Sequence, residues 1–202
     1  MADPDDDLIP LPPADLLLPL RLYEEAVTIW RLHWEDDPRA PRRYPTGKYR
    51  FDAPAGEYPV TYGNADRLAS FAEVYGDRRQ ILASEAGRRL SLLSAERPLR
   101  LVTLDEAETF HALGLDARIS TTKRYTRTQA WSLALHHWLP EADGIRYAGR
   151  HAGKHCNYCL FLDRCGGDLA VWRQGELQDL RQIVLFAARR YALRAAIPWR
   201  AP

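Results

Sequence analysis

Residues 48–76 read KYRFDAPAGEYPVTYGNADRLASFAEVYG and hold a turn, a strand and a helix in one short run. The segment VTYG at 60–63 is β-branched and aromatic, which favours a strand. The apolar residues of 64–76 recur at the spacing of one helix face, with Asn or Asp as the N-cap before them and glycine after them. Glu73 lies beside that face, and Arg50 precedes the turn. This order suggests a binding site as well as a piece of the core.

Strands and helices continue on both sides of this segment. The run AVTIWRLHW at 26–34 is apolar on both faces and predicts a buried strand, in which Arg31 is the misfit. Further strands are expected at 97–105, 143–149 and 157–163, a short extended piece at 49–51, and helices at 105–114, 127–140 and 176–196. Because the elements alternate without a regular βαβ period, we expect an α+β fold rather than a doubly wound parallel sheet.

The length of 202 residues suits a single domain with a flanking arm. Residues 1–24 combine an acidic cluster with several prolines, so they form neither a long helix nor a central strand. We expect them to be an N-terminal arm, with the leucines at 16–18 docked on the domain. Residues 25–202 are then the single mixed domain.

Composition excludes several classes of function. The 28 basic and 27 acidic residues nearly cancel, so the formal charge of +1 gives no field that would attract nucleic acid, and direct nucleic-acid binding is not expected. No apolar run approaches the roughly 18 residues of a membrane span, and no membrane partner is expected. The three cysteines, an odd number between 156 and 165, fit a reducing compartment. We therefore expect a cytoplasmic protein.

Three residues carry both a structural and a functional interpretation. A buried guanidinium at Arg31 needs a carboxylate or an anionic ligand as its partner, because an unpaired buried charge is costly. Glu73 alone is also typical of a solvated helix residue, and Tyr62 alone of a core aromatic. Taken one at a time, these residues leave both interpretations open.

A zinc site is one alternative, since HAGKHCNYCLFLDRC at 151–165 contains a C-x-x-C spacing beside two histidines. A structural zinc site usually needs two such pairs, and the segment also has the pattern of a strand with small buried thiols. We therefore expect no metal.

Several fragments occur in an order that is typical of one family. They are WRLH, YRFDAPAGEYPVTYG, FAEVYG, PLRLVTL, LDARI, QAW, DGIRYAGRH and CLFLDR. Together they resemble the RES domain over roughly Ile29 to Cys165. Each fragment is weak alone, and the order and spacing of the set make the resemblance specific.

The resemblance implies a fold related to ADP-ribosyltransferases, with central sheets flanked by helices. It implies the toxin half of a bacterial toxin–antitoxin pair, whose partner is an Xre-like antitoxin protein. Such toxins consume NAD+ as a substrate by breaking the nicotinamide–ribose bond through hydrolysis, phosphorolysis or ADP-ribosyl transfer. The acceptor and the oligomeric state, whether a homo-oligomer or a hetero-oligomer with the antitoxin, stay open.

The resemblance also assigns site residues. Glu73 and Arg31 are expected to be catalytic, because a carboxylate stabilises the cation-like sugar and an arginine clamps the pyrophosphate. Aromatic rings are expected to stack the nicotinamide. The nucleotide-binding residues implied are Arg31, Arg50, Phe51, Tyr62, Tyr147 and Gly149.

Gly149 is a departure from the family pattern, which has serine in its Y-x-S-R segment where this chain has YAGR at 147–150. A glycine supplies no hydroxyl, so the hydrogen bond of the serine is lost, replaced by water or made by the Gly149 backbone N–H. The alternative function is therefore a catalytically impaired RES-like protein that binds NAD+ or a partner without turnover.

Overall fold

The computed structural model describes residues 9–40, 47–151 and 153–200. The strands are β1 (Tyr23–Glu25), β2 (Thr28–His33), β3 (Val60–Asn64), β4 (Gln80–Ile81), β5 (Arg89–Ala95), β6 (Leu99–Leu104), β7 (Gly144–Ala148), β8 (Cys156–Phe161), β9 (Leu169–Glu176) and β10 (Arg194–Ala195). The α-helices are α1 (Arg67–Tyr75), α2 (Ala107–Leu113), α3 (Arg118–Thr121), α4 (Thr126–Trp138), α5 (Leu162–Cys165) and α6 (Arg181–Arg190). Short 3-10 turns occupy Ala83–Glu85, Gly166–Asp168 and Leu177–Asp179.

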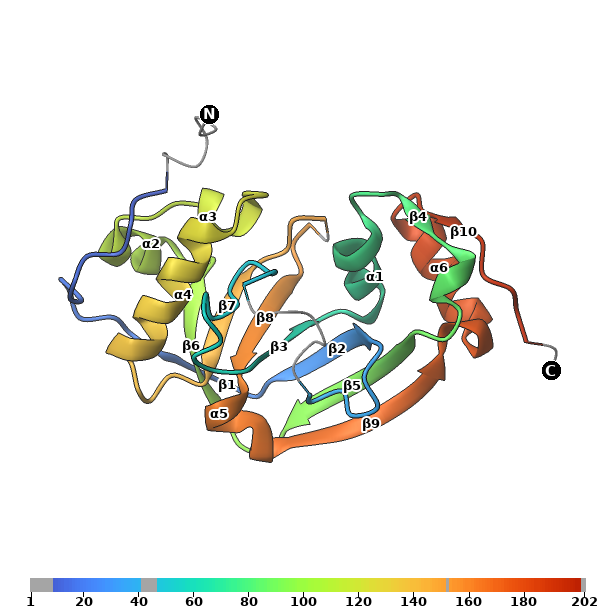
Figure 1. The fold of residues 1–202 in the computed structure, drawn as a ribbon, viewed down its shortest axis with the longest axis horizontal. Coiled ribbons are helices and arrows are strands. Elements are labelled where there is room, and N and C mark those ends of the chain that lie inside the picture. Colours follow the sequence, from blue (N-terminus) through green and yellow to red (C-terminus); the bar gives the residue numbers. More distant parts are fainter. Residues whose placement is uncertain (1–8, 41–46, 152, 201–202) are drawn as a thin grey trace.

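Within the described residues, eight strands form one curled sheet in the order β1-β6-β7-β8-β3-β2-β5-β9. Only β6 and β7 pair in parallel, and the other neighbours are antiparallel. Figure 1 shows α2, α3 and α4 over one end of this sheet, and α1 with α6 over the other. This confirms the predicted α+β fold.

Apolar residues form separate clusters under the two groups of helices. Under α4, Trp131 and Leu135 pack with Ile145 and Phe161 of the sheet. Under α1 and α6, a second cluster buries side chains from β2, α1 and α6; its fully buried members include Leu32, Phe71, Tyr75, Leu90 and Val184. The buried polar side chains of Arg31, Asn64 and Asn157, on β2, β3 and β8, form what we call the polar strip of the sheet, and the site is built there.

The strand predicted at 60–63 and the helix predicted at 64–76 are confirmed as β3 and α1. Helix α1 begins where the Asp66 side chain accepts a hydrogen bond from the Ala69 N–H, which satisfies one free donor of the first turn. Its buried face includes Phe71 and Tyr75, as the periodicity predicts.

Other predicted elements were wrong. Residues 49–51 form a turn, because the Asp52 carboxylate accepts hydrogen bonds from the N–H groups of Lys48 and Tyr49. The single helix predicted at 176–196 is divided: a 3-10 turn and α6 are followed by β10, which pairs in parallel with β4. Strands β5 and β9 were not predicted, and they extend the sheet beyond β2.

The first described residues of the segment predicted to be an N-terminal arm pack against α4. Ile9 is buried in the first cluster, and Leu16 packs on it, whereas Leu17 and Leu18 are exposed. The indole N–H of Trp131 donates to the carbonyl of Pro10 at 2.7 Å. The acidic residues 1–7 lie outside the described residues. Among the residues described, no helix combines the length and apolar character needed to cross a membrane.

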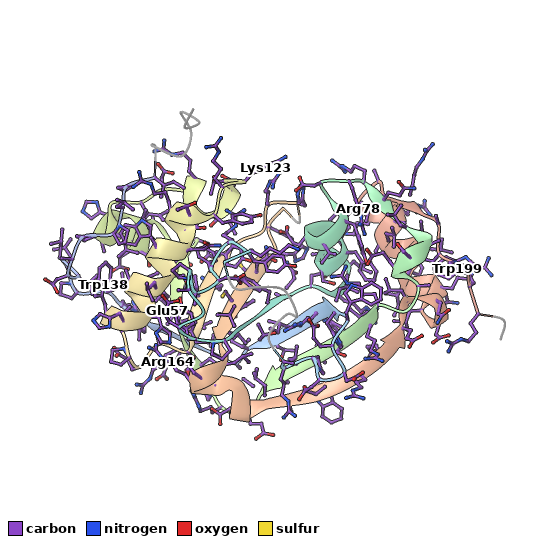
Figure 2. The ribbon with its side chains drawn as sticks, viewed as in Figure 1. Glu57, Arg78, Lys123, Trp138, Arg164 and Trp199 are labelled. Atoms are coloured by element: carbon purple, nitrogen blue, oxygen red, sulfur yellow. The ribbon has the colours of Figure 1, made fainter. Side chains whose placement is uncertain are left out.

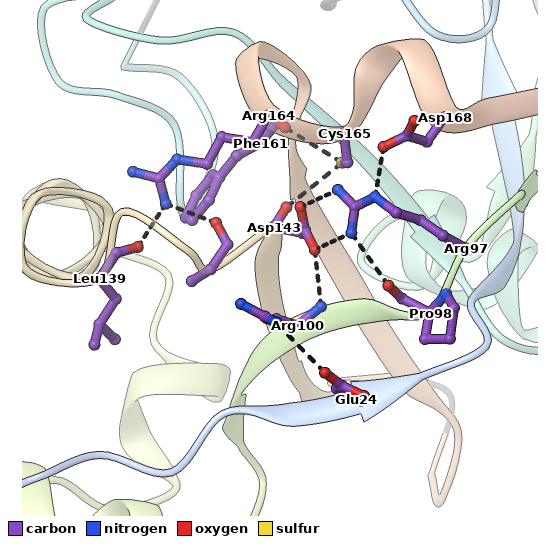
Figure 3. A network of polar contacts seen from close by, with 11 residues as sticks. Glu24, Arg97, Pro98, Arg100, Leu139, Asp143, Phe161, Arg164, Cys165 and Asp168 are labelled. Carbon is purple, nitrogen blue, oxygen red and sulfur yellow. Dashed lines mark hydrogen bonds and ion pairs between the residues drawn. The ribbon is translucent and has the colours of Figure 1, made fainter.

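Asp143 ties the parallel pair β6 and β7 together (Figure 3). Its carboxylate accepts two hydrogen bonds from Arg97, at 2.7 and 2.8 Å, and one from the N–H of Arg100 at 2.8 Å. Burial alone would raise the pKa of Asp143, but the hydrogen bonds and charge of Arg97 outweigh it and hold that pKa below its ordinary value.

We predict that Asp143→Asn lowers the free energy of unfolding by roughly 1–3 kcal/mol, because it leaves the partly buried donors of Arg97 and Arg100 badly matched. The pKa of Asp143 is lower in the folded state than in the unfolded state. The wild type should therefore exceed the variant in free energy of unfolding by the full amount above about pH 4, and this difference should shrink as the pH falls below that value. Urea unfolding of both proteins from pH 7 to pH 2 measures this. Asp168→Asn, at a more exposed partner of Arg97, is the control and should cost less than about 1 kcal/mol. Equal losses from the two variants would contradict the prediction.

Candidate functional site

A cleft of about 460 Å³ lies over the polar strip. Its volume falls in the range of small-molecule sites, roughly 300–1,000 Å³. Residues from β2 and β3 line it together with residues from α1, the 49–50 turn and the end of β7. Five of the sequence-predicted site residues line this cleft: Arg31, Arg50, Tyr62, Glu73 and Tyr147.

Glu73 projects from α1 and is held at both carboxylate oxygens. Its Oε1 accepts a hydrogen bond from the backbone N–H of His151 at 2.7 Å, and its Oε2 accepts one from the side-chain Nδ2 of Asn157 at 2.9 Å. Asn157 belongs to β8 and His151 to the β7–β8 connection, so both donors come from segments that are distant from α1 in the sequence. The acid is therefore held in one orientation and is not a freely solvated helix residue.

Gly76 makes this arrangement sterically possible. A Cβ atom at Gly76 would lie 2.4 Å from the His151 ring and 2.4 Å from the carbonyl oxygen of Ala72, closer than atoms can approach. Because the end of α1 carries no side chain there, the β7–β8 connection packs directly on it. This close packing brings the His151 N–H to the Glu73 carboxylate.

Arg31 extends from β2 and is almost completely buried, with 1% of its surface exposed. Its Nη1 donates to the Thr61 hydroxyl on β3, and its Nη2 lies 3.3 Å from Glu35 Oε2. A protein carboxylate therefore compensates the charge of Arg31. The structural interpretation left open by the sequence is confirmed, while the residue also lines the cleft.

Arg50 is buried as well, but its surroundings differ. Its Nη1 donates to the carbonyl of Ile119 at 3.2 Å, and its guanidinium lies 5.2 Å from the centre of the Tyr125 ring. Burial lowers the pKa of Arg50, since desolvation disfavours the charged form. Within the described ranges, no carboxylate lies at ion-pair distance from it. This cation is suited to an anion that enters the cleft.

The aromatic residues form one group beside Arg50. The Tyr62 hydroxyl donates to Asp52 at 2.9 Å and accepts from the Phe51 N–H at 3.0 Å, and burial raises its pKa. Phe51 is fully buried, lies outside the cleft lining and meets the Tyr147 ring edge-on at 4.9 Å. Tyr62 and Tyr147 therefore reach the cleft, and Phe51 supports them from behind.

Gly149 also lies outside the cleft lining. Its backbone N–H donates to the carbonyl of His155 at 3.2 Å, inside the β7–β8 connection. One of the two possible substitutes for the serine hydroxyl, the Gly149 N–H, is thus already engaged within the protein.

Arg150, at the rim, was not singled out by the sequence. It pairs with Asp77 at 2.8 Å, and Lys123 approaches the same carboxylate at 3.6 Å. Burial of Asp77 alone would raise its pKa, but the nearby cations, Arg150 first, hold it below its ordinary value. Figure 2 shows Lys123 and Arg78 on the same side of the molecule, from the α3 and α1 sides respectively. Arg150 and Lys123 therefore share the Asp77 carboxylate, which an anionic ligand would have to displace.

Glu85, Arg78 and Arg88 form an ion cluster in the lining of the same cleft. Glu85 accepts hydrogen bonds from Arg78 at 2.6 Å, from Arg88 at 2.9 Å and from the Tyr75 hydroxyl at 3.0 Å. Burial raises the pKa of Glu85, but the two arginines outweigh that effect and lower it. In contrast to Arg50, these two arginines have a carboxylate at ion-pair distance, and they share it.

Sequence reasoning also missed Asn157, His151 and Tyr125 as lining residues. Asn157 stands as a polar residue at the start of an apolar strand, and the same kind of misfit drew attention to Arg31. His151 donates through its backbone, for which its side chain gives no signal.

The cysteine segment does not gather metal ligands. Cys159 and Cys165 are buried, and the Cys156 thiol donates to Asp105 at 3.2 Å. Burial raises the pKa of Cys156 to about 11 and that of Cys165 to about 12. In the part of the chain that the structure describes, no group of three or more His, Cys, Asp or Glu residues is arranged to hold a metal ion.

Comparisons with known proteins identify the fold and the family of the chain. A chain of the crystal structure of the M. tuberculosis MbcT–MbcA toxin–antitoxin complex has a similar fold, with a TM-score of 0.57 and 15% sequence identity. The alignment covers 83% of this chain and 92% of that chain. A search of curated proteins gave no match. The sequence matches the RES domain over residues 28–195. The chain therefore belongs to the RES domain family.

Proposed function

We propose that this protein is the toxin of a bacterial toxin–antitoxin pair and that it consumes NAD+ by cleaving the nicotinamide–ribose bond. One observation carries the proposal: a single cleft contains a buried arginine, Arg50, whose charge no described carboxylate compensates, together with the firmly held carboxylate of Glu73. Membership of the RES domain family and the likeness to a chain of a toxin–antitoxin complex support the toxin role.

Arg50 binds the pyrophosphate of NAD+. A guanidinium suits phosphate oxygens because its N–H groups form a planar fork. Arg150 adds a second cation at the rim once the ligand displaces Asp77. Arg31, already paired with Glu35, contributes positive potential from the floor of the cleft.

Glu73 stabilises the charge that develops on the sugar. When the bond between C1′ and the nicotinamide nitrogen breaks, its electron pair leaves with nicotinamide and the ribose acquires oxocarbenium character. A fixed carboxylate near C1′ lowers the energy of that cation. An incoming nucleophile then forms the new bond to C1′; water or phosphate gives a free product, and a protein side chain gives an ADP-ribosylated target.

The tyrosine rings at Tyr62 and Tyr147 bind the flat nicotinamide ring. Both line the cleft, and the Tyr62 ring is held by the hydrogen bonds of its hydroxyl to the 51–52 turn. Phe51 packs behind Tyr147 and keeps its ring in place. An Xre-like antitoxin is the proposed protein partner, which would silence this activity.

We predict that Glu73→Gln lowers kcat for nicotinamide release by about 100-fold to 1,000-fold, because it removes the charge that stabilises the cation. The fold should persist, because the glutamine oxygen can still accept one of the two hydrogen bonds. Loss of the other should lower the free energy of unfolding by about 1 kcal/mol. Glu96→Gln, at an exposed position, is the matched control. Turnover of Glu73→Gln equal to wild type would remove Glu73 from the mechanism.

Arg50→Gln should raise the KM for NAD+ by about 10-fold to 100-fold, since a hydrogen bond to a charged group contributes about 1.5–3 kcal/mol. Arg189→Gln, on the exposed face of α6, should leave KM unchanged. Steady-state kinetics of the three proteins measures the difference. An unchanged KM in Arg50→Gln would mean that the pyrophosphate lies elsewhere.

Gly149→Ser tests the departure from the family pattern. Gly149 does not have a positive φ, so serine can adopt its backbone conformation. A new hydroxyl that bonds the nucleotide contributes about 0.5–1.5 kcal/mol, which corresponds to a rate increase of about 2-fold to 13-fold. We expect faster nicotinamide release from this variant. An equal or lower rate would mean that the site functions without the hydroxyl, and no release from wild type would favour the impaired, NAD+-binding alternative.

A further inference from the structure

We infer that Asn64 and Asn157 form a relay of two side-chain amides that orients the Glu73 carboxylate for catalysis. The two asparagines are register partners on neighbouring strands, Asn64 at the end of β3 and Asn157 on β8. This inference rests on the proposed function and names positioning residues for it.

Three consecutive hydrogen bonds make up the relay. The backbone N–H of Asp66 donates to Asn64 Oδ1 at 2.7 Å. Asn64 Nδ2 donates to Asn157 Oδ1 at 2.7 Å, and Asn157 Nδ2 donates to Glu73 Oε2 at 2.9 Å. The chain of donors thus runs from the backbone before α1 to the carboxylate on the same helix.

The two ends of the relay determine its direction. A backbone N–H can only donate, so the oxygen of Asn64 must face Asp66 and its NH₂ group must face Asn157. Asn157 therefore accepts with its oxygen and presents its own NH₂ group to Glu73. The opposite orientation would set donor against donor at Asp66 and oxygen against oxygen at Glu73. Only one arrangement satisfies all four groups, and it ends in a donor to the carboxylate.

Burial makes that preference strong. Asn64 is 1% exposed and Asn157 5% exposed, so water does not readily replace a lost partner. Asp66 is also the N-cap of α1, where its side chain accepts from the Ala69 N–H at 2.8 Å. The relay therefore connects the start of the helix that carries Glu73 with the carboxylate of Glu73 itself.

The two donors to Glu73 fix the orientation of its carboxylate as well as its position. The N–H of His151 meets Oε1 and the amide of Asn157 meets Oε2, so two donors from different segments define the plane of the carboxylate. Without the Asn157 donor, the group would turn about its side-chain torsions and move its charge away from C1′. A displacement of about 1 Å can cost roughly 100-fold in rate.

Neither asparagine is a catalytic residue in this account, because each acts through Glu73. Two properties separate a positioning relay from a simple structural contact. Loss of either asparagine should lower kcat without a matching rise in KM. The two losses should also overlap, since Asn64 acts only by orienting Asn157.

The activity test uses Asn64→Ala, Asn157→Ala, the double variant and, as a control, Gln174→Ala on the exposed edge strand β9. Nicotinamide release is measured with NAD+, and thermal unfolding is recorded for each protein. We expect each single asparagine variant to lose about 10-fold to 100-fold in kcat with KM within about 3-fold of wild type. The double variant should lose no more than Asn157→Ala alone, and the control should match wild type. Unchanged kcat, losses that multiply in the double variant, or a loss carried by KM would overturn the relay.

A second readout does not need turnover. If wild type releases no nicotinamide, the proposed function fails, and the relay is tested by thermal unfolding of Asn157→Ala, Glu73→Ala and their double variant. A direct bond between the two side chains predicts that the decrease in melting temperature of the double variant is smaller than the sum of the two single decreases. The decrease in melting temperature of Asn64→Ala combined with Glu73→Ala should likewise be smaller than the sum of the two single decreases. Fully additive decreases in the melting temperature would overturn the inference.

Discussion

The hydrogen bonds of the Glu73 carboxylate are the interaction on which the cleft depends. Glu73 belongs to α1, whereas its two donors, His151 N–H and Asn157 Nδ2, belong to the β7–β8 connection and to β8. These two hydrogen bonds tie α1 to the β7–β8 connection and to β8 through the same group that the proposed mechanism uses. Gly76 permits this closeness by leaving room for the β7–β8 connection. Fold and proposed chemistry are coupled at one side chain.

The arginines of the cleft show that burial alone does not identify a ligand-binding cation. Arg31 is the more deeply buried, yet Glu35 compensates it, and Arg78 and Arg88 share Glu85. Arg50 is buried against a carbonyl and a tyrosine ring instead. Among these four arginines, Arg50 is therefore the one with no described carboxylate at ion-pair distance, although the whole chain carries a formal charge of only +1.

Local patterns in the sequence predicted those parts of the fold whose cause is local. The helix at 64–76 follows from its apolar spacing and its cap, and Glu73 and Arg50 were found beside it. The turn at 49–52 depends on the carboxylate of Asp52, and β10 exists because a distant strand pairs with it, so neither has a local period. The same limit applies to the site. Asn157 matters through a contact with a residue 84 positions earlier, which no spacing rule reveals.

The most direct test of the account is a crystal structure with an NAD+ analogue whose nicotinamide-bearing ring is carbocyclic and resists cleavage. The account predicts that the pyrophosphate contacts Arg50, that the nicotinamide lies against Tyr62 or Tyr147, and that the Glu73 carboxylate faces the carbon bonded to nicotinamide. Both asparagine amides should keep the orientation described above. An analogue bound outside this cleft, or bound with its nicotinamide-bearing carbon remote from Glu73, would contradict the account.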